Sequence, residues 1–294
     1  MRFALSITLV VLLTLVLSAC SALGIMNAFA PAGTYNATAD VAYGPDPREM
    51  LDVYQPLAAV DASAPRAGYP VVVFFYGGAW NTGERKDYRF VGEALAARGI
   101  VTMIADYRLY PQVRYPDFLA DCARAFAWAR REAPRFGGDA SRVFLMGHSS
   151  GAYNAAMLAL DPRWLTAAGS SPSAMAGWIG LAGPYDFLPM TNVAAQPVFY
   201  HPNYPPGSQP IDYVSRNAPR AFLGAAAVDA VVNPERNTRQ LAEKLQAAGV
   251  PVTLRMYQKV NHYTMIGAFG RPLRRLDPVL DDVAAFVRGE SQPQ

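Results

Sequence analysis

Ser149 lies at the centre of Gly147-His148-Ser149-Ser150-Gly151, a string of the form Gly-x-Ser-x-Gly. An apolar run, Val143-Phe144-Leu145-Met146, precedes the string, and a helix-compatible run follows it. In a strand-turn-helix elbow the two glycines keep a tight turn free of side chains, and the serine hydroxyl projects above a helix N-terminus. A glycine-rich turn that merely joins a strand to a helix is the simpler interpretation. The position of the string between these runs favours a nucleophilic serine.

A serine hydroxyl becomes a useful nucleophile at neutral pH when a base accepts its proton and a third group orients that base. The chain has three histidines, His148, His201 and His262. His148 lies inside the elbow and His201 lies beside a proline. His262 follows the expected strand 252–257, in an expected loop near the end of the domain. We therefore predict His262 as the base, the alternative being a surface histidine without a chemical role.

The acid that orients the base should lie between the serine and the histidine in chain order. Asp229 sits in a turn after the expected strand 221–227, one strand-helix-strand unit before His262. Asp186 also follows an expected strand, and Asp212 lies farther away in a proline-rich interval. We predict Asp229 as the acid. Asp186 is the main rival and is otherwise expected to shape its turn through bonds to the backbone.

A negatively charged carbonyl oxygen, formed during attack on an ester or amide, requires backbone donors that are already in place. Tyr76-Gly77-Gly78-Ala79-Trp80 follows the first buried run and offers a backbone without bulky side chains, although a Gly-Gly pair is also an ordinary turn. The N–H of Ser150 supplies another donor. Trp80, Tyr153 and Phe187 could line a substrate pocket, but aromatic residues beside an elbow are as often part of the core.

The other reactive residue types point to no further chemistry. Asp106 and Arg108 are expected to pair locally, and Cys122 is expected to be a buried apolar residue because it lies on the inner face of its helix. His, Cys, Asp and Glu do not occur with metal-ligand spacing, and no glycine-rich phosphate loop follows a strand. The sequence thus predicts neither a metal nor a cofactor.

Buried strands and amphipathic helices alternate around these residues, which specifies an α/β fold with a doubly wound, mainly parallel sheet and helices on both faces. Ligands of such sheets bind beyond the carboxyl ends of the strands. We expect one catalytic domain over residues 40–290, interrupted by an irregular insertion, 196–210, that could act as a lid. The expected strands are 48–54, 71–75, 100–105, 143–146, 175–181, 221–227 and 252–257, and the expected helices are 88–98, 118–131, one from 149, 234–248 and 277–288.

Residues 1–19 have the pattern of an export signal, in which an apolar run is followed by small residues. Leu17-Ser18-Ala19-Cys20 resembles a bacterial lipobox, which implies cleavage before Cys20 and a lipid anchor on its thiol. A soluble secreted protein and an uncleaved anchor are the alternatives, and all three place the domain in the cell envelope or beyond, outside the cytoplasm. Ser21 resembles the pattern of outer-membrane lipoproteins. Residues 20–39, small and polar, are expected to form a tether, with folded structure starting near Val41.

The charge balance excludes one class of partner. Lys and Arg number 26 and Asp and Glu number 23, giving 26 − 23 = +3 spread along the chain. This is too small and too dispersed for nucleic acid or for an anionic membrane surface. Contact with a membrane is therefore expected through the lipid at Cys20 alone.

The motifs together resemble those of the carboxylesterase-type α/β-hydrolases over about residues 40–288. Within these the chain is most similar to the group that contains acetyl-xylan and feruloyl esterase-like enzymes, kynurenine formamidase-like enzymes and isoprenylcysteine methylesterases. The resemblance rests on residues 76–80, which we call the Gly-Gly loop, on the elbow, and on the strings 106–109, 183–187 and 261–263. It implies a Ser149-Asp229-His262 triad and an oxyanion hole formed by Gly77, Gly78 and Ser150. Tyr76 stands where the family usually has histidine.

From these residues we expect a serine hydrolase that cleaves small-molecule carboxylic esters, with short acyl chains, through an acyl-enzyme. The first alternative is an amide hydrolase, either formamidase-like or exopeptidase-like, that uses the same triad. The second is a non-catalytic binding lipoprotein on a hydrolase fold, which would require a broken triad.

Overall fold

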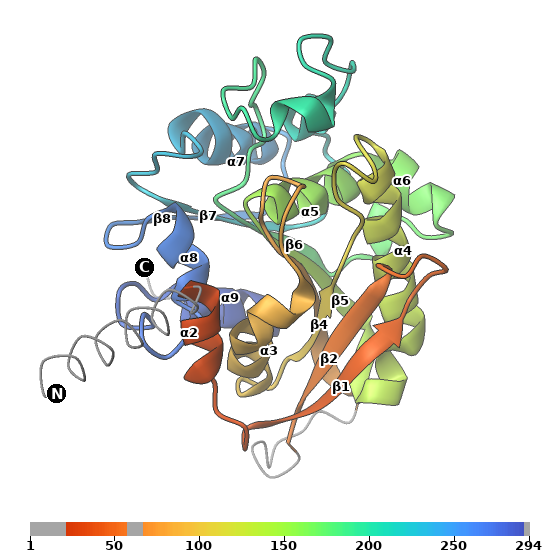
Figure 1. Ribbon diagram of the computed structural model, residues 1–294, viewed down its shortest axis with the longest axis vertical. Coiled ribbons are helices and arrows are strands. Elements are labelled where there is room, and N and C mark those ends of the chain that lie inside the picture. Colours follow the sequence, from red (N-terminus) through yellow and green to blue (C-terminus); the bar gives the residue numbers. More distant parts are fainter. Residues whose placement is uncertain (1–21, 58–66, 291–294) are drawn as a thin grey trace, which may run out of the picture.

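The computed structural model describes residues 22–57 and 67–290, and these form one sheet with helices packed on both faces (Figure 1). The sheet has eight strands in the order β1-β2-β4-β3-β5-β6-β7-β8. β1 and β2 pair antiparallel, as do β2 and β4, and all other pairs are parallel. The strands are β1 Tyr35–Ala42, β2 Met50–Pro56, β3 Tyr69–Phe75, β4 Val101–Ala105, β5 Gly138–His148, β6 Gly177–Leu181, β7 Ala221–Ala226 and β8 Val252–Tyr257.

The direction in which the chain crosses the sheet explains where the helices lie. From β3 the chain moves outward to β4, and from β4 it returns past β3 to β5. Right-handed crossovers therefore put α3 and α4 on opposite faces. α9 contacts α3, and α4 contacts α5 and α6. The helices are α2 Ala22–Ala28, α3 Arg89–Ala96, α4 Asp117–Glu132, α5 Ser150–Leu160, α6 Pro162–Ala167, α7 Gln240–Ala247, α8 His262–Gly267 and α9 Val279–Arg288.

The reversal between β3 and β5 creates the crevice in which a doubly wound sheet binds its ligand, at the carboxyl ends of the two strands. β4, β6 and β7 are buried along their whole length, as continuous apolar runs require in a sheet covered on both faces. The predicted fold class is confirmed. The Gly-Gly loop follows β3 and Ser149 follows β5, so the topology alone brings these two segments together.

The N-terminal part of the described chain differs from the predicted tether. α2 and the first five residues of β1 lie within residues 20–39, and folded structure begins well before Val41. β1 was missed because its side chains are largely exposed and carry no apolar pattern, so its pairing with β2 determines its structure. The signal at 1–19 and the lipid site at Cys20 lie outside the described residues. No helix within residues 22–57 and 67–290 is long and apolar enough to span a membrane.

Two further segments depart from expectation in part. Helix 234–248 begins with a π-helical turn, Glu235–Arg239, before α7. Insertion 196–210 is largely irregular, as predicted, with a short 3-10 helix at Gln196–Phe199. Its Phe199 is buried against Trp80, at a ring-centroid distance of 4.9 Å, so this end of the insertion belongs to the core.

The predicted local pair of Asp106 and Arg108 is wrong. Arg108 donates hydrogen bonds to Asp121 of α4 through its backbone N–H, its Nε and its Nη2, and Asp106 pairs with Arg85. Both carboxylates are buried, and each is neutralised by an arginine from a different segment. Cys122 is buried as predicted, and burial raises the pKa of its thiol.

Candidate active site

Ser149 occupies a strained turn between β5 and α5, with φ 54° and ψ −122°. The two glycines of the elbow are required by close backbone contacts. A Cβ on Gly147 would lie 2.1 Å from the carbonyl oxygen of Gly151, and one on Gly151 would lie 2.0 Å from that of Phe75. The elbow is therefore wedged against the end of β3, which places the serine at the carboxyl edge of the sheet.

His262 contacts both other members of the predicted triad. Its Nε2 is 3.0 Å from Ser149 Oγ, and its Nδ1 is 2.8 Å from Asp229 Oδ2. We had expected His262 in a loop, but it is the first residue of α8. Asn261 caps this helix in a capping box with Thr264, which fixes the start of the helix and thus the imidazole.

Asp229 lies in the turn after β7 and is held ionised by its neighbours. Burial alone would raise its pKa, but hydrogen bonds from His262 and from the N–H groups of Val231 and Val232 lower it below the ordinary value. An ionised carboxylate only accepts, so Nδ1 of His262 carries the proton. Nε2 is then free to accept the proton of Ser149. The rival Asp186 binds Arg236 instead, with N–O distances of 2.9 and 3.1 Å.

His148 has a role that sequence reasoning missed. Its Nε2 is 2.8 Å from the backbone oxygen of His262, to which it donates a hydrogen bond. Burial, with a contribution from His262, lowers the pKa of His148 to about 3, so the ring is neutral at physiological pH. A neutral imidazole can donate here without placing a second positive charge beside the base. No local pattern could have shown this contact, because the two residues are 114 positions apart.

The Gly-Gly loop lies directly against Ser149. A Cβ on Gly77 would be 3.0 Å from the Cβ of Ser149, and Gly78 has a φ of 131° that favours glycine. Among residues 22–57 and 67–290, no group accepts a hydrogen bond from the N–H of Gly77, Gly78 or Ser150. Unpaired amides next to a nucleophile are what an oxyanion hole needs. The sequence-predicted donors are therefore brought together.

Tyr76 fills the place of the usual histidine and supports the same loop. Its ring stacks between Tyr88 and Tyr107, with centroid distances of 5.4 and 5.0 Å, and its hydroxyl donates to Asp106 at 2.7 Å. The ring also lies close to Gly83, where a Cβ would be 2.8 Å away. The Tyr107 hydroxyl also donates to the backbone oxygen of Tyr76 at 2.8 Å, so ring stacking and two buried hydrogen bonds support the loop.

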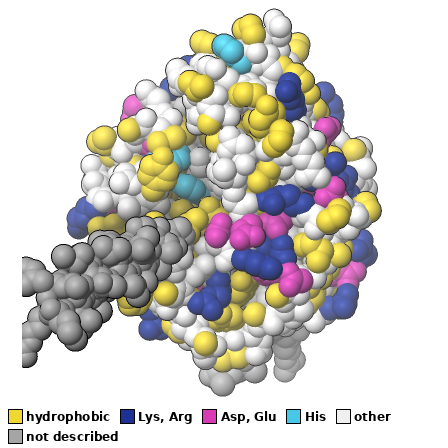
Figure 2. All heavy atoms as spheres, in the orientation of Figure 1, with side chains coloured by type: hydrophobic (Ala, Val, Ile, Leu, Met, Phe, Trp, Pro, Cys, Tyr) yellow, Lys and Arg dark blue, Asp and Glu magenta, His cyan; other side chains and the backbone are white. Residues whose placement is uncertain are grey.

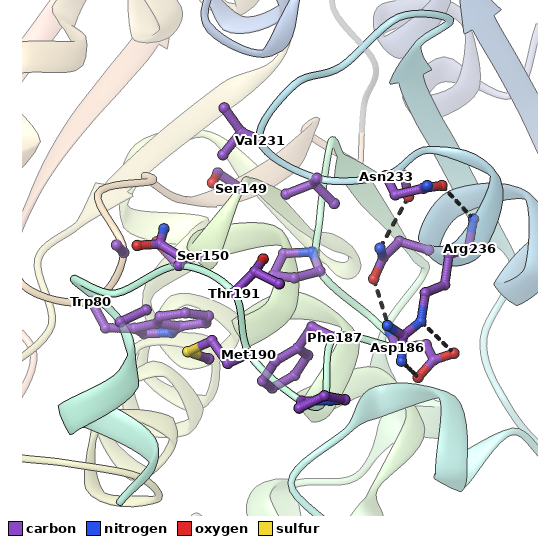
Figure 3. Close-up of a pocket in the computed structure, with 17 residues that line it drawn as sticks. Trp80, Ser149, Ser150, Asp186, Phe187, Met190, Thr191, Val231, Asn233 and Arg236 are labelled. Atoms are coloured by element: carbon purple, nitrogen blue, oxygen red, sulfur yellow. Dashed lines mark hydrogen bonds and ion pairs between the residues drawn. The ribbon is translucent and has the colours of Figure 1, made fainter. Parts of the chain in front are cut away.

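Two cavities meet at Ser149. The smaller, which we call the acyl-side cavity, has a volume of about 250 Å³, and Figure 3 shows it extending from Ser149 past Trp80 and Met190 to Asp186 and Arg236. The larger, which we call the helix-side chamber, has a volume of about 650 Å³ and is lined by α2, the Gly-Gly loop and α8. Ser149 lines both, whereas His262 lines only the chamber.

Of the three aromatic residues expected to line a substrate pocket, Trp80 and Phe187 line the acyl-side cavity. Tyr153 lines neither cavity, and that prediction is corrected. Its ring packs behind Trp80 at 5.1 Å, and its hydroxyl donates to the backbone of Ser208 at 2.8 Å. A residue four positions after the nucleophile lies one turn into α5, and here that turn faces the core. Asp186, Met190 and Arg236 line the cavity without having been predicted to do so.

The titratable side chains that the structure describes form no metal-binding cluster, and on one face of the molecule their charges are mixed in sign. Within the described ranges no group of three or more His, Cys, Asp or Glu side chains could hold a metal ion. On the face drawn in Figure 2, acidic and basic side chains lie side by side. This intermixing agrees with the small, dispersed net charge of the sequence.

The fold, with its elbow after β5 and its histidine after β8, defines an α/β-hydrolase of the carboxylesterase type. Residues 51–245 match the BD-FAE family, and the chain belongs to that family. Esterase LipC of Mycobacterium tuberculosis is 31% identical over 225 residues, covering 70% of this chain and 54% of LipC. Isoprenylcysteine alpha-carbonyl methylesterase ICME of Arabidopsis thaliana is 26% identical, covering 85% of this chain and 62% of ICME.

The chain spans a little over half the length of these curated relatives. Among solved structures, a truncated carbohydrate esterase from gut microbiota superposes with a TM-score of 0.72 at 19% identity, covering 88% of this chain and 98% of that one. This likeness supports the fold, and the chemistry must be argued from the site.

Proposed function

We propose that this protein hydrolyses carboxylic esters through an acyl-enzyme on Ser149. The observation that carries the proposal is the unbroken contact from Ser149 through His262 to Asp229, at 3.0 and 2.8 Å. Unpaired amides of the Gly-Gly loop and of Ser150 lie beside the serine. This arrangement supplies the base, its orienting acid and the donors that acyl transfer requires.

The reaction proceeds in two steps. His262 accepts the Ser149 proton as the hydroxyl attacks the ester carbonyl, and Asp229 stabilises the resulting imidazolium. The negatively charged oxygen is bound by the backbone N–H groups, and His262 then protonates the departing alcohol. In the second step His262 activates a water that attacks the acyl-enzyme and releases the acid.

The size of the acyl-side cavity supports a preference for short acyl groups. Its volume is about 250 Å³, and the Asp186–Arg236 pair lines it. A long acyl chain would exceed this volume and would have to extend out of the cavity. We therefore propose small-molecule esters of short acids as substrates.

Replacement of the nucleophile tests the proposal. We expect Ser149→Ala to abolish hydrolysis of p-nitrophenyl acetate and labelling by a fluorophosphonate probe, because both reactions require the hydroxyl that contacts His262. Ser141→Ala, which changes an exposed serine of the preceding strand β5, is the matched control and should keep both. Retention of most activity by Ser149→Ala would contradict the proposal, and absence of labelling in the wild type would favour a non-catalytic binding protein.

Amide cleavage is separated from ester cleavage by substrate choice. Rates on short-chain esters, N-formyl amides and dipeptide anilides should be compared at equal enzyme concentration. We expect the esters to have the highest kcat/KM. A higher value on the formyl amides or anilides would assign the same triad to an amide hydrolase.

For the segment before α2 we propose lipid attachment at Cys20, supported by the sequence Leu17-Ser18-Ala19-Cys20. The expected result is a diacylglycerol mass increment on the N-terminal peptide of the mature protein and its loss in Cys20→Ser. Cell fractionation then tests whether the protein lies in the cell envelope. It also tests whether the protein reaches the outer membrane, as Ser21 after the cysteine predicts. A mature protein without lipid would contradict the anchor.

A further inference from the structure

Ser149 lies where two cavities of different size meet, and the position of His262 distinguishes them. His262 lines the helix-side chamber and is absent from the lining of the acyl-side cavity. In ester hydrolysis the imidazolium must protonate the oxygen of the departing alcohol. The alcohol must therefore lie on the side of Ser149 where His262 lies.

From this geometry, and resting on the proposed ester hydrolysis, we infer that the helix-side chamber binds the alcohol part of the substrate and that α2 is a specificity-determining wall of that site. The acid part then occupies the acyl-side cavity, which is less than half as large, at about 250 against about 650 Å³. The substrate class that follows is an ester of a short acid with a bulky, largely apolar alcohol.

The lining of the chamber supports an apolar alcohol. Leu23 and Met26 project into it from α2, and Tyr263 and Ile266 line it from α8. Tyr263 is 72% exposed, so it stands at the rim, where an apolar substrate group can bury it. Charged side chains are scarce in this lining, and Asp87 is the one carboxylate among its described residues.

α2 is fixed in place rather than loosely attached. The side chain of Asn27 donates to the backbone oxygen of Lys86 at 2.9 Å and accepts from the N–H of Phe90 at 3.1 Å. Met26 packs on Gly270, where a Cβ would lie 2.8 Å from its sulfur. These contacts come from two segments remote in sequence, so the helix can act as a wall with a defined position.

The two faces of α2 provide a matched pair of variants. Leu23 is partly buried and lines the chamber, whereas Ile25 is 42% exposed and lines neither cavity. Leu23→Trp adds bulk inside the proposed alcohol site, and Ile25→Trp adds the same bulk outside it. On the other side of Ser149, Met190→Trp narrows the acyl-side cavity.

The experiment measures kcat/KM for two ester series on the wild type and the three variants. One series is acetates of ethanol, benzyl alcohol and 2-(2-naphthyl)ethanol, which are primary alcohols of similar acidity. The other is ethyl esters of acetic, butyric and hexanoic acids. For the wild type we expect kcat/KM to rise with alcohol size and to fall with acid length.

Leu23→Trp is expected to lower kcat/KM for the naphthylethyl ester at least about tenfold relative to ethyl acetate and to leave the order of the acid series unchanged. Met190→Trp is expected to lower kcat/KM for ethyl hexanoate relative to ethyl acetate and to leave the order of the alcohol series unchanged. Ile25→Trp should stay within about twofold of the wild type on every ester. Equal losses of Leu23→Trp on small and bulky acetates, or exchanged effects of Leu23→Trp and Met190→Trp, would overturn the assignment. Failure of the wild type on every ester would instead overturn the proposed function.

Discussion

At the scale of single residues, two neighbours fix the His262 imidazole that contacts Ser149. Asp229 accepts from its ring, and His148 binds its backbone oxygen from the other side. Three hydrogen bonds keep Asp229 ionised, so that it can accept from His262. Burial keeps His148 neutral, so that it adds no positive charge beside the base. The base is thereby held in one tautomer with its Nε2 toward the nucleophile.

Exchange of each candidate acid should identify the one that acts. We expect Asp229→Asn to lower kcat roughly 10⁴-fold, because an amide no longer holds His262 in the tautomer that accepts the serine proton. The matched change Asp186→Asn, which weakens the pair with Arg236 at the far end of the cavity, should cost less than about tenfold. The measurement is steady-state hydrolysis of p-nitrophenyl acetate. A larger loss in Asp186→Asn would reverse the assignment.

The lowered pKa of His148 makes a prediction about stability against pH. The folded state binds this proton only near pH 3, whereas the unfolded chain binds it near pH 6.5. As the pH falls from about 6.5, the unfolded state therefore binds more protons, and the free energy of unfolding drops by up to about 1.4 kcal/mol per pH unit from this group. His148→Gln keeps a donor for the oxygen of His262 but does not titrate.

Urea denaturation at pH 7.5, 6 and 5 is the measurement. We expect the difference in free energy of unfolding between pH 7.5 and pH 5 to be smaller in His148→Gln than in the wild type by about 1–2 kcal/mol. Parallel pH dependence of the two proteins would show that the folded state protonates His148 at its ordinary pKa.

At the scale of elements, the elbow depends on how closely α5 approaches β3. Gly151, the second residue of α5, lies against the carbonyl oxygen of Phe75, and Gly147, near the end of β5, lies against the backbone of Gly151. The parallel pairing of β3 with β5 fixes the distance between the end of β3 and the start of α5, so these two segments cannot move apart. The sequence pattern of the elbow is thus a consequence of backbone packing as well as of chemistry.

Gly151→Ala should therefore destabilise the fold and disable the site together. A Cβ placed 2.0 Å from a backbone oxygen forces β3 and α5 apart. We expect a loss of roughly 3 kcal/mol or more in the free energy of unfolding, with loss of fluorophosphonate labelling. The control is Gly33→Ala, where an added Cβ meets nothing within 4 Å. Normal stability of Gly151→Ala in urea denaturation would contradict this account of the elbow.

At the scale of the whole molecule, a buried ionic cluster joins the N-terminal strands to the site. Arg85 is 7% exposed and pairs with Asp40 of β1, Asp52 of β2 and Asp106 after β4. Asp106 also accepts from Tyr76, which lies beneath the Gly-Gly loop. The antiparallel edge of the sheet is in this way connected to the loop that carries the oxyanion donors.

Removal of the shared arginine should be costly, because it leaves buried carboxylates without a cation. We expect Arg85→Met to lower the free energy of unfolding by about 3–5 kcal/mol, measured by urea denaturation. Arg131→Met is the control, since its side chain is 65% exposed and pairs with Glu132 at the surface, and it should cost less than about 1 kcal/mol. Similar small losses in both variants would show that the cluster contributes little net stability.

The sequence by itself determined the features that local patterns encode. Apolar runs predicted the buried strands, and the glycines around Ser149 predicted the elbow, because burial on both faces and tight backbone packing restrict residue types along a short stretch. Chain order then singled out Asp229 and His262, which the structure places in contact. β1 and α2 escaped prediction because exposed or mixed side chains leave no period to detect.

The tertiary structure alone decided which remote groups meet. The hydrogen bond of His148 to His262, the cluster around Arg85 and the place of α2 beside Ser149 each join segments 12 to more than 100 residues apart. Such contacts depend on the packing of whole elements, and no residue type or spacing is reserved for them. The shape of the two cavities, and with it the proposed choice of acid and alcohol, arises from that packing.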